Sequence, residues 1–281
     1  MIHAAVWPIG GARARVRSVF RLRGKGDGLS DLILPDVGSA DIVIQLGGPS
    51  MLARGGNWLA SPQCYVLGQI ERAVGTRYAP HVDLVGIRLG AGCACLLGCS
   101  VAELRNGLYP LADRQHRSSV RRLVAWADAF VRGRSSIGSL VAEIESVLCL
   151  CDHLAREAAR RIVDSGSGVA AASADLGLSR RHLTRRFESA FGITPRAFKR
   201  LARFSRACQG VSLAPPSSWT QVAVAAGYCD HAHLDRDFQV FAGAPPTALF
   251  SAQWYGSFVL EDQEHRSGGG LSSMSRLRID M

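Results

Sequence analysis

The chain has 281 residues, of which 47% are hydrophobic and 20% are charged, and its formal net charge is +10. This length and apolar content favour one large or two moderate folded domains and exclude a largely disordered chain. We find no uncharged apolar run of about 18 residues and no basic leader before an apolar segment, so we expect a cytoplasmic protein with no membrane span and reduced cysteines. The basic excess favours a polyanionic partner.

The first 115 residues carry strand patterns. Arginine alternates with small or apolar residues from Arg13 to Arg23, which predicts a half-buried strand with one basic face. We interpret that face as a solvated sheet surface, with an anion or partner site as the alternative. Further strands are predicted at Asp41–Leu46, Cys64–Ile70 and Val82–Leu89, between turns rich in Gly and Pro. Residues 1–115 are therefore expected to form a small antiparallel barrel or sandwich.

Residues 116–167 are predicted to form a helical linker region. Just before it, Ser100–Glu103 matches a capping box that opens a short helix. Apolar residues at helical spacing predict an amphipathic helix from Val120 to Phe130 and a longer one from Leu140 to Ala158. Their apolar faces offer a surface for a second subunit, so a homodimer is one expected partner.

The C-terminal half contains one pattern twice. Leu183–Pro195 (LTRRFESAFGITP) and Leu234–Pro246 (LDRDFQVFAGAPP) share L-x-R-x-F, four residues and G-x-x-P, at an offset of 51 positions. Each is preceded by a glycine, Gly177 or Gly227. A helix, a tight turn with Gly and a second helix define a helix-turn-helix, so the sequence predicts two such units.

The helices that would read DNA are predicted at Ser179–Phe191 and Asp230–Phe241, with Ser179 as an N-cap. Between the units, a helix that Pro195 opens runs to about Gln209, spanning about 21 Å. This length suits a helix that connects two DNA-contacting helices in successive major grooves, which are about 34 Å apart.

The two units differ in net charge. From Arg180 to Arg206 there are nine basic residues against one acidic residue, whereas from Trp219 to Trp254 there is one basic residue against three acidic ones. We therefore expect the first unit to supply most of the phosphate affinity and the second to make a weaker or geometric contact.

These residues resemble the AraC/XylS family of transcription regulators over roughly Gly168 to Trp254, through LGLSRRHLTRRFESAFGITP and VAAGYCDHAHLDRDFQVFAGAPP. The resemblance implies an all-α, seven-helix DNA-binding domain with two helix-turn-helix motifs at residues 168–254. The N-terminal half is similar to the sensor domain of a subgroup of that family, through LPDVGSADIVIQLGG and VGIRLGAGCACLLGCSVAEL. That similarity implies a cupin-like barrel in an α+β chain. It also implies binding of a small effector or dimerisation. Residues 255–281 are expected to be a disordered tail.

The expected partner is double-stranded promoter DNA, with RNA polymerase as a further expected contact. We predict base or near-base contacts for Arg180, Arg181 and Thr184. Backbone contacts are predicted for Arg185, Arg186, Lys199, Arg200 and Arg203, and DNA contact or a capping role for His182, His231 and His233. Arg236 completes the set. It shares with Arg185 the alternative of a structural ion pair with a carboxylate such as Asp175 or Asp230.

Other functions have less support. Cys93, Cys95 and Cys99, and Cys149, Cys151 and His153, lack the paired C-x-x-C spacing of zinc sites, so we predict buried thiols and neither metal nor cofactor. A thiol-sensor or methyl-acceptor regulator stays an alternative, as does an architectural protein that binds DNA without sequence preference. The common nucleotide-binding, hydrolase and metalloprotease motifs are absent, so no enzyme is expected.

Overall fold

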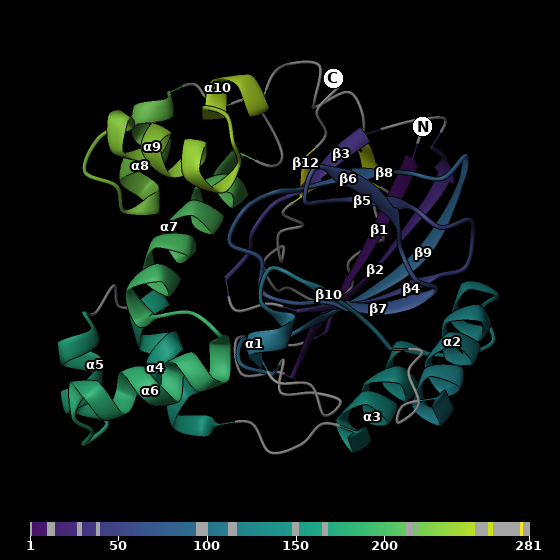
Figure 1. The fold of residues 1–281 in the computed structure, drawn as a ribbon, viewed down its shortest axis with the longest axis horizontal. Coiled ribbons are helices and arrows are strands. Elements are labelled where there is room, and N and C mark those ends of the chain that lie inside the picture. Colours follow the sequence, from purple (N-terminus) through teal and green to yellow (C-terminus); the bar gives the residue numbers. More distant parts are fainter. Residues whose placement is uncertain are drawn as a thin grey trace.

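The computed structural model of the chain describes residues 2–9, 15–26, 30–37, 40–93, 101–111, 117–147, 152–164, 168–211, 216, 218–250, 258–260 and 276–277. A β-rich N-terminal half lies beside a helical C-terminal half (Figure 1). This arrangement confirms the predicted α+β class.

Two sheets build the N-terminal half. In the described residues, the first sheet has the order β10-β7-β4-β9-β2-β1-β11 and the second has the order β12-β3-β8-β5-β6. All pairs are antiparallel except β1 with β11. The first sheet comprises β1 (Ile2–Pro8), β2 (Val16–Lys25), β4 (Asp41–Gln45), β7 (Cys64–Leu67), β9 (His81–Leu89), β10 (Leu108–Pro110) and β11 (Phe258–Leu260). The second comprises β3 (Ser30–Ile33), β5 (Met51–Arg54), β6 (Asn57–Ala60), β8 (Val74–Arg77) and β12 (Arg276–Leu277).

Side chains fill the described space between the two sheets. Phe20 and Leu22 of the first sheet and Leu52 of the second belong to one buried cluster. Gly86 makes room for Phe20, because a Cβ at position 86 would lie 1.9 Å from the Phe20 ring. The N-terminal half is therefore a packed sandwich in its described part.

Strand β2 confirms the alternating pattern seen in the sequence, with one irregularity. Phe20 and Leu22 are buried, whereas Arg21 is half-buried and Arg23 is exposed. The register shifts between Val16 and Ser18, and Ser18 and Val19 are both buried. Val19 belongs to a different buried cluster from Phe20 and Leu22. Arg13 and Ala14 lie outside the described residues.

Helices α2 (Arg117–Val131) and α3 (Ile137–Val147) cover the outer face of the first sheet. Leu123, Ala127 and Leu140 are buried there against Ile42 and Val85. The prediction that these apolar positions are open to a second subunit is wrong, because the sheet already covers them.

The prediction of one long helix from Leu140 to Ala158 is also wrong. Helix α3 ends at Val147 and α4 (His153–Asp164) begins a new helix. The Asp152 carboxylate caps α4, since it accepts hydrogen bonds from the N–H groups of Leu154 (3.1 Å) and Ala155 (3.0 Å). Residues 148–151 lie outside the described residues.

Seven helices make up residues 153–250 of the described chain. The resemblance implied this number, but it placed all of them at residues 168–254, where six of the described helices lie. The seven are α4, α5 (Val169–Asp175), α6 (Arg180–Phe191), α7 (Pro195–Val211), α8 (Trp219–Ala226), α9 (His231–Phe241) and α10 (Pro246–Leu249). All seven contribute to or flank one core, in which Phe187, Phe198, Phe204 and Phe238 are fully buried. Helix α4, which falls in the predicted linker region, packs into this core through Ala155, Ala158 and Ile162.

One further helix and the two strands of the C-terminal segment complete the described fold. A short helix, α1 (Val101–Leu104), occurs where the capping box predicted one, although Ser100 lies outside the described residues. Within the predicted disordered tail, β11 pairs with β1 and β12 pairs with β3, because sheet edges leave backbone groups available for pairing. In the parts of the chain described above, no helix combines the length and apolar character that a membrane crossing requires.

Candidate DNA-binding interface

The first helix-turn-helix unit is built from α5 and α6. After α5 the chain turns at Gly177, whose φ of +64° suits glycine. The N–H of Gly177 donates to the Ala174 carbonyl (3.0 Å) and that of Leu178 donates to the Ser173 carbonyl (2.9 Å), the pattern of a Schellman motif. Ser179 then caps α6 by accepting from the N–H of His182. The turn at Gly177 and the cap at Ser179 confirm predictions from the sequence.

The second unit repeats this geometry with one inserted residue. Gly227 has a φ of +87°, and its N–H donates to the Val224 carbonyl (3.0 Å). The Tyr228 N–H donates to the Ala223 carbonyl (2.9 Å). Cys229 then separates the turn from Asp230, which caps α9 by accepting from the His233 N–H (2.6 Å). This extra residue explains why the two turns are 50 positions apart and the two helices 51.

Helix α6 exposes a basic face. Leu183, Phe187 and Ala190 are buried, as predicted. On the outward side, Arg180, Arg181 and Arg185 are exposed, and His182 and Thr184 are half-buried. The possible carboxylate partner of Arg185, Asp175, pairs instead with Arg161 (2.8 Å). The exposed set can therefore reach a bound duplex.

Arg186 has a different orientation from its neighbours. Its guanidinium donates to the Asp152 carboxylate (3.0 Å), which joins α6 to the start of α4. Burial alone would raise the pKa of Asp152, but the Ala155 N–H and the Arg186 guanidinium outweigh it, and the pKa is lowered. Arg186 thus anchors the reading helix, and its predicted phosphate contact stays a prediction.

The acidic residues of helix α9 make contacts within the protein. Asp230 is the cap, and Asp235 lies 3.2 Å from the His231 imidazole. His233 packs edge-on against the Tyr228 ring at 5.1 Å. Arg236 is exposed and donates to the Ala232 carbonyl (3.1 Å) rather than to Asp230. His231, His233 and Arg236 thus lie on the first two turns of the second reading helix.

Asp237 ties α9 to the connecting helix. It is 1% exposed and accepts a hydrogen bond from Arg200 of α7 (2.5 Å). The Arg200 guanidinium also lies over the Phe241 ring at 5.0 Å. Asp237 occupies the position equivalent to Arg186, so each reading helix uses the same position, with opposite charge, for an internal ion pair.

Arg203 and Arg206 of α7 also make contacts within the protein. The Arg203 guanidinium lies over the Tyr228 ring at 5.1 Å. Arg206 donates to the carbonyls of Val163 (2.9 Å) and Ala226 (3.3 Å). Lys199 is half-buried. Arg200 and Arg203 therefore hold α7 against the second unit, and their predicted contacts with the DNA backbone stay predictions.

Helix α7 also joins the two units through aromatic side chains. Phe198 packs against Phe187 and Phe191 of the first unit, with 5.0 Å between ring centroids in both cases. Six residues later, Phe204 packs against Phe238 (4.8 Å) and Phe241 (5.1 Å) of the second unit. The connecting helix thus belongs to both units.

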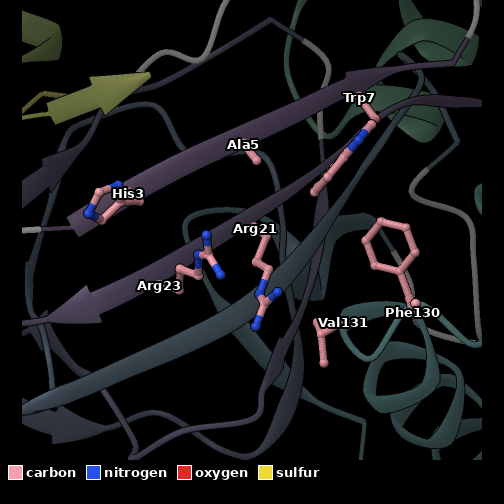
Figure 2. Close-up of a pocket in the computed structure, with 8 residues that line it drawn as sticks. His3, Ala5, Trp7, Arg21, Arg23, Phe130 and Val131 are labelled. Atoms are coloured by element: carbon pink, nitrogen blue, oxygen red, sulfur yellow. The ribbon is translucent and has the colours of Figure 1, made fainter. Parts of the chain in front are cut away.

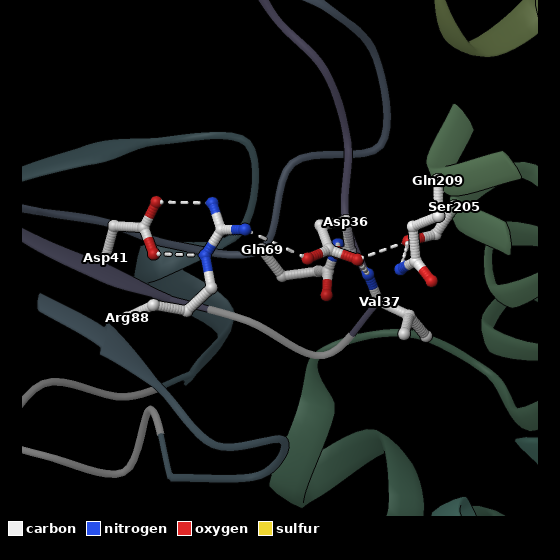
Figure 3. A network of polar contacts seen from close by, with 7 residues as sticks. All are labelled: Asp36, Val37, Asp41, Gln69, Arg88, Ser205 and Gln209. Atoms are coloured by element: carbon white, nitrogen blue, oxygen red, sulfur yellow. Dashed lines mark hydrogen bonds and ion pairs between the residues drawn. The ribbon is translucent and has the colours of Figure 1, made fainter. Parts of the chain in front are cut away.

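A buried polar network joins the sandwich to α7 (Figure 3). Arg88 of β9 donates twice to Asp41 (3.0 Å each) and once to Asp36 (3.2 Å). Desolvation would lower the pKa of Arg88, but the two carboxylates outweigh it and raise the pKa, so the guanidinium stays charged. On its other side Asp36 accepts from the Ser205 hydroxyl of α7 (2.5 Å).

The N-terminal half contacts three more helices of the C-terminal core. The Ala73 N–H donates to the Phe241 carbonyl at the end of α9 (2.6 Å). Arg156 of α4 donates to the Ala91 carbonyl (3.2 Å). Val101 of α1 lies next to Gly192, which ends α6. The sandwich therefore touches α4, α6, α7 and α9.

The described cysteines behave as buried thiols with one exception. Burial raises the pKa of Cys64 to about 12, and burial together with Asp36 raises that of Cys208. Both stay protonated at neutral pH, and a protonated thiol is a poor nucleophile. Cys229 is exposed. No cluster able to hold a metal occurs in the described residues; Cys95, Cys99, Cys149 and Cys151 lie outside them.

Comparison with known families agrees with this geometry. Residues 153–252 match a family model described as a helix-turn-helix domain. Residues 153–252 therefore form a helix-turn-helix domain. Both predicted helix-turn-helix units lie within the matched residues, and the match also includes α4.

Solved structures give weaker similarities, and no curated protein matches the chain. ToxT from Vibrio cholerae O395 is 13% identical, with 88% of this chain and 95% of that chain covered and a TM-score of 0.48. The AraC-like transcriptional activator CuxR is 13% identical, with coverage of 69% and 83% and a TM-score of 0.27. A cupin-2 domain from Rhodospirillum rubrum is 15% identical, with coverage of 47% and 90% and a TM-score of 0.17. At these sequence identities and TM-scores, the ligands and activities of those proteins are not assigned to this chain.

The Asp152–Arg186 pair predicts an acid-sensitive junction between α4 and α6. Because the pKa of Asp152 is lowered on folding, its charge stabilises the fold above the ordinary Asp value of about 3.9, and the effect fades as the pH falls through the folded pKa. Asp152→Asn keeps a capping residue and removes the charge. We expect it to lower the free energy of unfolding by about 1 kcal/mol at pH 7.

Thermal unfolding of both proteins between pH 7 and pH 3 measures this difference, which should shrink as the pH falls. Asp128→Asn on α2 is the matched control, because its carboxylate pairs with exposed Arg132 (2.9 Å) outside this junction. A difference between wild type and Asp152→Asn that grows on acidification would contradict the assignment.

Proposed function

We propose that this protein is a sequence-specific, AraC-type transcription regulator that has no catalytic role and binds promoter DNA through α6 and α9. The observation that carries the proposal is the pair of capped reading helices built into one core, with an exposed arginine face on the first. Such helices enter the major groove with their N-terminal residues at the base edges.

Helix α6 has the chemistry for most of the affinity. Arg180 and Arg181 are exposed in its first turn, where a guanidinium can donate two hydrogen bonds to O6 and N7 of guanine. Thr184, half-buried on the same helix, can contact a base or its methyl group. Arg185 is suited to a phosphate, which adds affinity without sequence information.

Helix α9 has less positive charge to offer. Its three aspartates cap the helix or pair with His231 and Arg200, so few of its charged groups are available for DNA. His231, His233 and Arg236 are the residues we assign to the second groove. We propose that this contact mainly fixes the position and spacing of the site.

The N-terminal half is proposed to control the DNA-binding domain through the shared interface. Because the described interior of the sandwich is filled, we place no effector there. A cavity of about 430 Å³ opens at the interface, between Arg17 of β2, Arg156 of α4 and Phe198 of α7. A small molecule in this cavity would contact both halves and shift their relative placement.

An architectural protein without sequence preference is the second candidate, because it would share the basic face of α6. Two reading helices in fixed positions favour the specific regulator. Competition with random duplex DNA separates the two, since an architectural protein would show no preference for selected sequences.

We expect Arg181→Ala to weaken binding to a selected duplex about tenfold or more, because it removes a contact at the base edges. His231→Ala should cost only a few fold. Electrophoretic mobility shifts with duplexes selected from random DNA give both affinities, and Arg132→Ala on α2 serves as a control. A loss at His231 equal to or larger than that at Arg181 would refute the assignment of the main contact to α6.

Ser205→Ala tests the link between the two halves. The change removes the hydroxyl that donates to Asp36, so the sandwich no longer restrains α7 at this point. We expect a several-fold loss of affinity for the same duplex, because the two units then lose preorganisation. The slope of affinity against salt should not change, since phosphate contacts are untouched.

Ser173→Ala is the matched control, because Ser173 is also a buried helical serine, but its hydroxyl donates to the Ala170 carbonyl of its own helix (2.9 Å). It should bind as wild type does. Unchanged or higher affinity for Ser205→Ala would contradict a preorganising role for the contact.

A further inference from the structure

A pocket on the outer face of the first sheet is separate from the DNA-binding helices. It has a volume of about 310 Å³ and lies between strands β1 and β2 and the end of α2 (Figure 2). Figure 1 places α2 and α3 away from α5, α6, α8 and α9. Its lining consists of His3, Ala5, Trp7, Arg21, Arg23, Phe130, Val131 and Gly133.

Strand register produces the shape of the pocket. His3, Ala5 and Trp7 alternate along β1 and so share one face of the sheet. Across the ladder, His3 is opposite Arg23 and Ala5 is opposite Arg21. The small side chain of Ala5 leaves a notch between the larger side chains of His3 and Trp7.

One end of the pocket is aromatic. The Trp7 and Phe130 rings meet edge to face, with centroids 5.0 Å apart and an interplanar angle of 82°. Trp126 also stacks on Phe130, with ring centroids 5.0 Å apart and an interplanar angle of 14°. These contacts hold the Phe130 ring in place before any ligand arrives, and offset or edge-on packing is the arrangement that a further aromatic ring prefers.

The other end of the pocket is basic. Arg21 is fixed by Asp83, which accepts from its Nε (2.9 Å) and its Nη2 (2.8 Å). Arg23 is exposed beside it on the same strand. Among the described residues, the lining includes two arginines and a histidine and no acidic residue. Because Asp83 occupies one edge of the Arg21 guanidinium, Arg23 supplies the net positive charge at this end. This end therefore favours an anionic group, and a planar guanidinium is matched to a carboxylate.

The end of α2 sets the orientation of a ligand. Phe130 and Val131 belong to its last turn and Gly133 lies two residues beyond its end, where the helix dipole has its negative end. A carboxylate is therefore disfavoured at the aromatic end and directed to the arginines. A volume near the lower limit of ligand pockets suits one ring with a short side chain.

We propose that this pocket binds an aromatic monocarboxylate, with its ring against Trp7 and Phe130 and its carboxylate at Arg21 and Arg23. The site is independent of the proposed DNA contacts and of the interdomain cavity. It also gives a role to the basic face of β2, which the sequence left open between a solvated surface and an anion site.

Isothermal titration calorimetry of the full chain with phenylacetate tests the proposal. We expect saturable binding with a Kd at or below about 1 mM. Benzylamine, which has the ring and the opposite charge, and acetate, which lacks the ring, should bind at least about tenfold more weakly. Absence of phenylacetate binding up to about 10 mM would overturn the proposal. So would equal binding of benzylamine or acetate.

Substitutions on one strand locate the site. Arg23→Gln removes a charge from the pocket and should weaken phenylacetate binding about tenfold. Arg17→Gln makes the same change on the same strand, at a residue that lines the interdomain cavity instead, and should bind as wild type does. Ala5→Leu fills the notch and should abolish phenylacetate binding.

Because Ala5 is mostly buried, thermal unfolding checks that Ala5→Leu folds. If it does not fold, the comparison of Arg23→Gln with Arg17→Gln decides alone. A loss in Arg17→Gln with full binding in Arg23→Gln would overturn the assignment of the ligand to this pocket.

Discussion

The aromatic packing along α7 is the constraint on which the DNA-binding arrangement depends. Phe198 lies among rings of the first unit and Phe204 among rings of the second. The two positions are about 9 Å apart along one helix, so neither unit can turn about α7 without losing these contacts. Each ring is fully buried, and truncating such a side chain typically costs about 3–5 kcal/mol. The spacing and rotation of the reading helices are thus set by the core rather than by a loop.

Ion pairs at one repeated position complete this constraint and explain the unequal charge of the units. Arg186 binds Asp152, whereas Asp237, its equivalent 51 residues later, binds Arg200. The inward-facing charge is basic in one unit and acidic in the other, so one of the three acidic residues of α9 is buried. Through Ser205 and Asp36 the same helix α7 also meets the sandwich. One rigid helix therefore receives contacts from the N-terminal half and positions both reading helices.

Local rules predicted the repeats well, whereas long-range partners were not predictable from the sequence. Glycine turns, Ser179 as a cap and buried Leu183 and Phe187 follow from helical period and capping, which act within a few residues. Ser205 and Asp36 are 169 positions apart, and no local pattern indicates that they meet. Strand β1 was missed because IHAAVWP alternates weakly, and α3 and α4 were merged because apolar spacing continues past Asp152. Asp152, a good N-cap residue, is the signal that would have separated them.

Hydroxyl-radical footprinting of the full chain on a selected duplex tests the central claim most directly. If α7 holds two reading helices for neighbouring grooves, the cleavage pattern should show two protected patches about one helical turn, 10–10.5 bp, apart and on the same face of the duplex. A single protected patch, or two patches on opposite faces, would contradict the account.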